Sequence, residues 1–184
     1  MTLELIFGIL LAGLLSDNYA LLHFLGTGAV IENERTTGKS LIIGLGTTIV
    51  MVLSTLITWP INTYLLAGAT YLRTLVFVCV IMLVVELVHV FAKNRLENYC
   101  KVDFMKFAIN GAVLGLCIHN TEHGFVEALI TAAAVGIGLM ITMAIFSALH
   151  EKVDEESVPK AFRGLPIALL TAGMIALALL ALNF

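Results

Sequence analysis

Charged residues are scarce in this sequence of 184 residues, making up 12% of it, whereas hydrophobic residues make up 60%. Soluble globular proteins have about 25% charged residues and roughly half apolar residues. The composition therefore excludes an ordinary soluble domain and indicates a membrane protein. The net charge of −3 combines both signs, which leaves neither a basic footprint for nucleic acid nor a polybasic segment for lipid headgroups.

Cysteine is also rare, and Cys79, Cys100 and Cys117 show no C-x-x-C spacing. Two of them lie within apolar stretches, where a lone cysteine usually serves as a small interior residue. A glycine-rich nucleotide motif is missing as well, because Gly44-x-Gly46 lies within an apolar stretch and does not follow a strand. We therefore expect no nicotinamide or flavin site in this chain.

Long apolar stretches with few charges are abundant. They cover residues 3–16, 41–61, 71–88, 104–118, 126–149 and 164–183. A membrane-spanning helix needs about 20 residues to cross a hydrocarbon core of about 30 Å. We predict an all-α integral membrane protein in which residues 1–184 form a single membrane domain with six transmembrane helices.

Nine of the ten Lys and Arg residues lie in or beside the first, third and fifth loops of this arrangement. They are Arg35, Lys39, Lys93, Arg95, Lys101, Lys106, Lys152, Lys160 and Arg163. Cationic loops stay on the cytoplasmic side, so both termini are predicted to be non-cytoplasmic.

The two halves of the sequence resemble each other. Gly44-x-Gly46 recurs 92 residues later as Gly136-x-Gly138, Asn18-x-Ala20 recurs as Asn110-x-Ala112, and Arg73 and Arg163 each precede an apolar stretch. A unit of three helices that is repeated enters the bilayer from opposite sides. We therefore predict two inverted three-helix repeats, residues 1–92 and 104–184.

The first and fourth predicted helices are interrupted by polar residues. Asp17 and Asn18 end the first apolar stretch, and Asn110-Gly111 lies near the middle of the fourth. Interrupted helices and ionisable residues within a membrane are typical of ion paths, although small residues also allow close helix packing. Asp17, Asn18, Asn110 and Glu86 are the candidate ion-path residues. For Glu86, the alternative to a relay with His89 is simple solvation near the basic third loop.

A formal match to a zinc protease motif occurs at His119-Asn120-Thr121-Glu122-His123. In the H-x-x-E-H pattern two histidines on one helical face bind the metal and the glutamate acts as base. Here the pattern falls in the predicted connection between the fourth and fifth helices, with Glu127 as the nearest third ligand. We interpret it as a polar loop and predict no catalytic metal.

Several stretches resemble the A-type membrane protein of the Rnf (Rsx) ion-translocating electron-transport complex, which is a relative of the E-type membrane protein of the sodium-translocating NADH:quinone oxidoreductase. They run from end to end of the chain: Asp17-Asn18 through Phe24-Leu25-Gly26, Gly44-Leu45-Gly46-Thr47-Thr48 with Trp59, Tyr71-Leu72-Arg73-Thr74-Leu75, Val158-Pro159-x-x-Phe162-Arg163-Gly164, and Thr171-Ala172-Gly173.

The resemblance implies a bacterial or archaeal inner membrane protein. It also implies a homologous membrane partner of opposite topology, other subunits that carry flavin and iron–sulfur groups, and a [2Fe-2S] cluster shared within the membrane. The family's cluster cysteines correspond here to Gly28 and Gly111, and glycine has no thiolate to offer. We therefore expect no cluster bound by this chain, although recruitment of Cys79, Cys100 or Cys117 stays open.

The sequence leaves three functions open. The chain is expected to be a membrane subunit that serves coupled electron transfer and Na+ or H+ movement without carrying the redox chemistry. The alternatives are a self-contained ion transporter or channel built from inverted repeats, and a purely structural assembly subunit.

Overall fold

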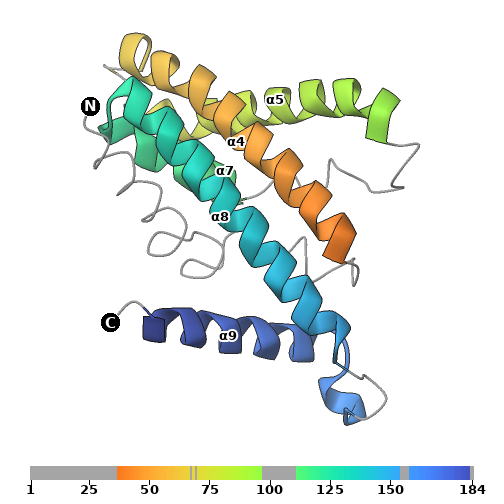
Figure 1. Ribbon diagram of the computed structural model, residues 1–184. Helices are drawn as coiled ribbons and strands as arrows, with labels where there is room; N and C mark the ends of the chain where they lie inside the picture. The colour runs from red at the N-terminus through yellow and green to blue at the C-terminus, as the bar shows by residue number, and fades with distance from the viewer. Residues whose placement is uncertain (1–36, 67, 69, 97–110, 154–157, 183–184) are drawn as a thin grey trace.

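The computed structural model describes residues 37–66, 68, 70–96, 111–153 and 158–182 (Figure 1). In these ranges all the regular structure is helical. The long helices are α4 (Thr37–Tyr64), α5 (Arg73–Leu96), α8 (Phe125–Glu151) and α9 (Leu165–Leu182), and α7 (Gly111–His119) is short. Single 3-10 turns occur at η2 (Thr70–Leu72), η3 (Asn120–Glu122) and η4 (Lys160–Phe162).

The described helices agree with four of the predicted apolar stretches and part of a fifth. The stretches 41–61, 71–88, 126–149 and 164–183 correspond to α4, α5, α8 and α9, and the described part of 104–118 is α7. In the described ranges three helical segments are long and apolar enough to span a membrane, namely Ser40–Tyr64, Thr70–Phe91 and Phe125–Glu151. The predicted helix over 3–16 lies outside the described residues.

Helices α4 and α8 form the core as a closely packed antiparallel pair (Figure 1). Their closest approach is at two glycines. A Cβ atom on Gly44 would lie 2.8 Å from Met140 Cα, and one on Gly136 would lie 3.0 Å from Thr48 Cα. Only glycine allows the backbones to come this close.

The two glycine contacts are equivalent under the sequence repeat. Gly136 lies 92 residues after Gly44, and Met140 lies 92 residues after Thr48. The contact of Gly44 with Met140 therefore becomes the contact of Thr48 with Gly136 when the halves are exchanged. Such reciprocal pairing is the mark of a two-fold interface, and the antiparallel course of the helices matches inversion of one half against the other.

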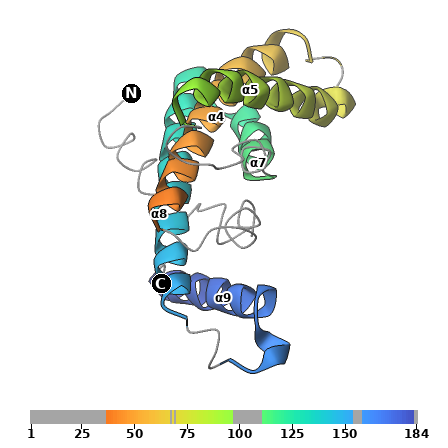
Figure 2. The same ribbon diagram turned by 90° about the vertical axis from the view of Figure 1, so that its right-hand side faces the viewer.

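Helices α5 and α9 lie at opposite ends of the α4–α8 pair (Figures 1 and 2). Each follows a single 3-10 turn, η2 before α5 and η4 before α9. The short helix α7 packs against α4 and α5. The third helices of the two predicted repeats are thus placed in a corresponding way.

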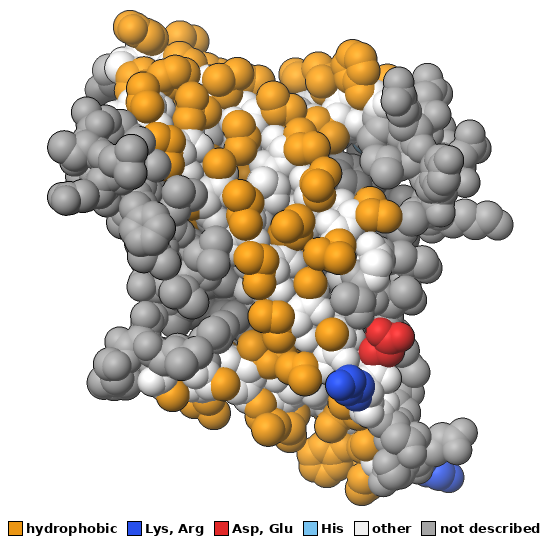
Figure 3. Space-filling model, in the orientation of Figure 1, with side chains coloured by type: hydrophobic (Ala, Val, Ile, Leu, Met, Phe, Trp, Pro, Cys, Tyr) orange, Lys and Arg blue, Asp and Glu red, His pale blue; other side chains and the backbone are white. Residues whose placement is uncertain are grey.

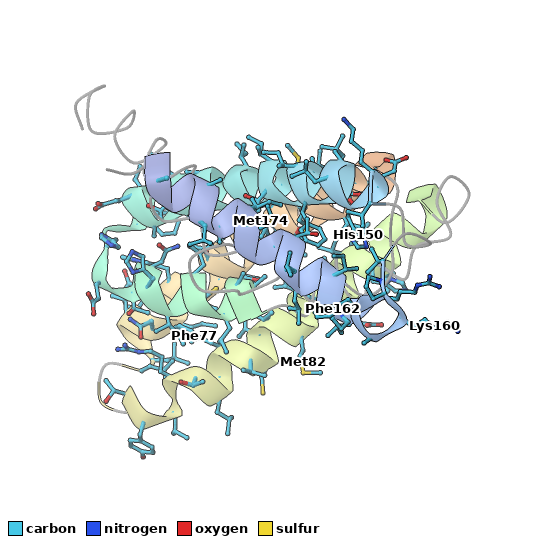
Figure 4. The ribbon with its side chains drawn as sticks, turned by 90° about the horizontal axis from the view of Figure 1, so that it is seen from below. Phe77, Met82, His150, Lys160, Phe162 and Met174 are labelled. Atoms are coloured by element: carbon cyan, nitrogen blue, oxygen red, sulfur yellow. The ribbon has the colours of Figure 1, made fainter. Side chains whose placement is uncertain are left out.

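Much of the apolar surface is exposed within the single chain. Only 22% of the Thr70–Phe91 segment is buried, and apolar side chains cover the face shown in Figure 3. Phe77 of α5 is fully buried, whereas Met82 of α5 and Met174 of α9 are more than half exposed (Figure 4). Surfaces of this kind face lipid or other subunits.

Candidate functional site

A buried polar junction joins α4 to the end of α7 and to η3. Helix α4 supplies Ser54, Thr55 and Thr58, and the facing side chains are Cys117 of α7 and Asn120 of η3. A helix turns 100° per residue, so the three α4 hydroxyls fall within a single arc of about 100°. All five residues have at most 2% of their surface exposed.

Asn120 connects three elements through its amide group. Its Nδ2 donates to the carbonyl oxygen of Ala128 in α8 at 3.1 Å and to Thr55 Oγ1 in α4 at 3.5 Å. Because the Ala128 carbonyl can only accept, the amide nitrogen must face it. The opposite atom, Oδ1, has no hydrogen-bond partner among the described residues.

Cys117 faces the α4 hydroxyls. Its thiol is hydrogen-bonded to the side chains of Thr58 and Thr55. The Thr58 hydroxyl donates its own proton to Ser54 O at 2.7 Å, so its oxygen receives the thiol proton. The prediction that Cys117 is a small interior residue agrees with this placement, but Cys79 is exposed on α5.

A second set of contacts closes the junction at the end of the bundle. Trp59 Nε1 donates to His123 O at 2.9 Å, and the Trp59 and Phe125 rings meet edge to face with centroids 5.1 Å apart. Arg73 Nη1 donates to Thr121 Oγ1 at 3.4 Å. These contacts hold α4, α5 and the start of α8 around η3.

Replacing Trp59 with Phe tests this closure. The variant keeps an aromatic ring against Phe125 but removes the donor to His123 O. A lost hydrogen bond of this kind costs about 1 kcal/mol, which lowers the melting temperature by about 2–4 °C for a chain of this size. Thermal denaturation followed by size-exclusion chromatography in detergent measures the shift. An unchanged melting temperature would show that the bond contributes nothing.

The zinc protease pattern does not keep its helical geometry. His119 ends α7, Glu122 ends η3, and His123 has extended backbone angles of φ −103° and ψ 160°. His123 Nδ1 instead lies 3.3 Å from Glu127 Oε1. The described residues contain no group of three or more His, Cys, Asp or Glu side chains placed to hold a metal ion. This geometry favours the interpretation as a polar connection.

The sequence-predicted site residues are only partly within the described ranges. Gly111 begins α7 and is exposed, and Glu86 is exposed on α5 beside the half-buried His89. Asp17, Asn18, Gly28 and Asn110 lie outside the described residues. The structure therefore does not bring these candidates together, and their role stays a prediction.

The surroundings of Gly111 do not fit an iron–sulfur ligand set within the described residues. Cys117 lies six residues further along, a rise of about 9 Å at 1.5 Å per residue, and its thiol is directed at Thr55 and Thr58 of α4. It therefore cannot take the position of a ligand at residue 111 without a change in α7.

Sequence reasoning missed Asn120, which it treated only as part of the zinc protease pattern. A usable signal was present in the spacing of Thr55 and Thr58, because polar residues three apart on an apolar helix share one face. What the spacing could not reveal is which residue faces them, since that depends on where α7 ends.

The fold and the junction define a polytopic helical membrane protein whose halves meet in antiparallel fashion. Residues 6–184 match the family described as "Rnf-Nqr subunit, membrane protein", and the chain belongs to this family. It is 33% identical to the A-type protein of the ion-translocating oxidoreductase complex of Thioalkalivibrio sulfidiphilus, with 92% of each chain covered. It is 31% identical to the corresponding A-type protein of Shigella sonnei, with 92% of this chain and 91% of the relative covered.

Proposed function

We propose that this chain is an integral-membrane subunit of a multi-subunit complex that couples electron transfer to the movement of Na+ or H+ across the membrane. The observation that carries the proposal is the match of residues 6–184 to the Rnf-Nqr subunit family. The similar proteins named above are subunits of ion-translocating oxidoreductase complexes. Flavin and iron chemistry then belong to other subunits, and this chain supplies membrane scaffold and part of an ion path.

The proposal includes six transmembrane helices in two inverted repeats of residues 1–92 and 104–184. The reciprocal contacts of Gly44 with Met140 and of Gly136 with Thr48 support it. Inverted repeats generally place their functional site near the bilayer midplane, at the interface of the two halves. With six helices in all, both termini lie on the same side of the membrane, the non-cytoplasmic side of the inner membrane.

The proposal also holds that this chain works without the intramembrane [2Fe-2S] cluster. Gly28 and Gly111 stand at both positions where a thiolate would be required. Cys117 is committed to the hydroxyls of α4. A homologous membrane subunit of opposite topology is the expected neighbour, and the exposed apolar side chains of α5 and α9 offer surface for it.

Ion uptake into inverted membrane vesicles tests this function. Vesicles from cells that contain the chain are expected to take up Na+ or H+ when electron transfer is started, and vesicles from cells lacking it are expected to lose that uptake. Restoring the chain should restore the uptake. Equal electron-driven uptake with and without the chain would refute the proposal.

The alternative function, an ion transporter made of this chain alone, predicts ion flux from the purified chain in liposomes without any electron donor. Flux of that kind, together with no dependence on redox partners, would favour the transporter.

A further inference from the structure

We infer that the buried junction of α4, α7 and η3 is a binding site for a small alkali cation, with Na+ as the probe ion, centred on Asn120. The inference rests on the proposed function, because it names where a translocated ion would pause. The observations that carry it are the burial of five polar residues in one place and the directions of their hydrogen bonds.

The first observation is an acceptor without a donor. Asn120 is 1% exposed, and its Oδ1 has no partner among the described residues. Rotating the amide would not help, because the Ala128 carbonyl at 3.1 Å needs the nitrogen where it stands. The free valence is therefore an oxygen lone pair.

The second observation is that the donors around Asn120 are already used. The Thr58 hydroxyl donates to Ser54 O at 2.7 Å, and both the Ala128 carbonyl and Thr55 Oγ1 accept from Asn120 Nδ2. The oxygens of Thr55 and Thr58 keep lone pairs. Ser54 Oγ, on the same face of α4, is fully buried and also has no partner in the described part of the chain. The junction thus presents acceptors and not donors, which excludes an anion.

The chemistry of the oxygens selects the class of cation. Amide and hydroxyl oxygens are hard, neutral ligands, whereas sites for divalent ions normally include carboxylates. No Asp or Glu side chain is among the five residues of the junction. A monovalent hard cation matches a neutral oxygen set, and weak neutral coordination also lets an ion leave again. A trapped water is the other donor that would satisfy these oxygens.

The position of the junction suits passage of an ion. Thr55 lies nine residues before the end of α4 at Tyr64, about 14 Å along the helix. On the same face of α4 towards that end lies Asn62, whose Oδ1 is buried and has no partner among the described residues. Polar oxygens therefore continue from the junction towards the end of the bundle.

Matched variants on α4 test the site in the purified complex. Thr55→Val keeps the shape of the side chain and removes a ligand, Thr55→Ser keeps the oxygen, and Thr47→Val makes the same change at a buried threonine that bonds only to Ile43 O and Gly44 O. We expect Thr55→Val to raise the Na+ concentration for half-maximal electron-driven uptake about tenfold, the effect of one lost interaction of ordinary strength. Thr55→Ser and Thr47→Val should remain near wild type. No shift in Thr55→Val, or an equal shift in Thr47→Val, would overturn the site.

A second measurement uses the wild-type complex and needs no variant. Cys117 lies against Thr55 and Thr58, so a bound ion should slow its alkylation by N-ethylmaleimide. Peptide mass spectrometry follows Cys117, with the exposed Cys79 as internal control. We expect Na+ to slow labelling of Cys117 relative to choline and to leave Cys79 unchanged. Equal labelling of Cys117 in both salts would indicate a trapped water and overturn the cation site. The vesicle test of function gives a separate answer, because it depends on the presence of the chain and not on Cys117.

Discussion

Replacing Gly44 and Gly136 together with Ala is expected to give the largest loss of folded protein of any pair of conservative changes in this chain. Each new Cβ would meet backbone, at 2.8 Å from Met140 Cα and at 3.0 Å from Thr48 Cα. Backbone cannot move aside as a flexible side chain can, and overpacking typically costs about 1–3 kcal/mol per site. The two losses need not add, since both changes act on one interface.

The matched control is Gly173→Ala in α9, where a Cβ would meet nothing within 4 Å. That variant should be neutral or more stable, because Ala favours helix over Gly by about 0.5–1 kcal/mol. Detergent-solubilised protein is compared by its monodisperse yield and melting temperature. If Gly44→Ala and Gly136→Ala melted like Gly173→Ala, the close approach of α4 and α8 would be wrong.

Introducing cysteine at Gly28 and Gly111 together is expected to add iron to the complex. A [2Fe-2S] cluster needs four thiolates, and a shared cluster takes two of them from each partner. Gly111 is exposed at the first residue of α7, where the helix N-terminus favours negative charge. The added iron is measured as the difference in iron content and visible absorption between the double variant and the parent complex.

The controls are the two single cysteine variants and the double serine variant, none of which completes the set. They should keep the iron content of the parent. A parent complex that already contains this iron and loses it on Cys117→Ser would show instead that Cys117 has been recruited as a ligand.

The helices were predictable because they are apolar over their whole length. The expected stretches 41–61 and 126–149 lie within α4 (Thr37–Tyr64) and α8 (Phe125–Glu151). Both helices run further than the apolar residues do, since polar residues such as Asn62 and Thr63 continue the backbone hydrogen bonding without adding hydropathy. The helix ends were therefore set too short, while the helix centres were right.

The partnership of α4 and α8 was only half predictable. The repeat made Gly44 and Gly136 equivalent, but equivalence does not say that the two segments touch. Contact depends on packing of Met140 and Thr48 into the opposite glycines, which requires the crossing point to be known. In the same way, the fully buried Asn120 could not be placed from its polar neighbours His119 and Thr121, of which one is exposed and one half-buried.

The most direct test of the central claim is purification through a tag on this chain in mild detergent, followed by identification of the co-purifying subunits and measurement of flavin. We predict a hetero-oligomer that contains a homologous membrane subunit and flavin-bearing subunits, as expected for a member of the Rnf-Nqr family. Recovery of this chain alone, as a homo-oligomer without flavin or iron, would contradict the assignment to an electron-transport complex.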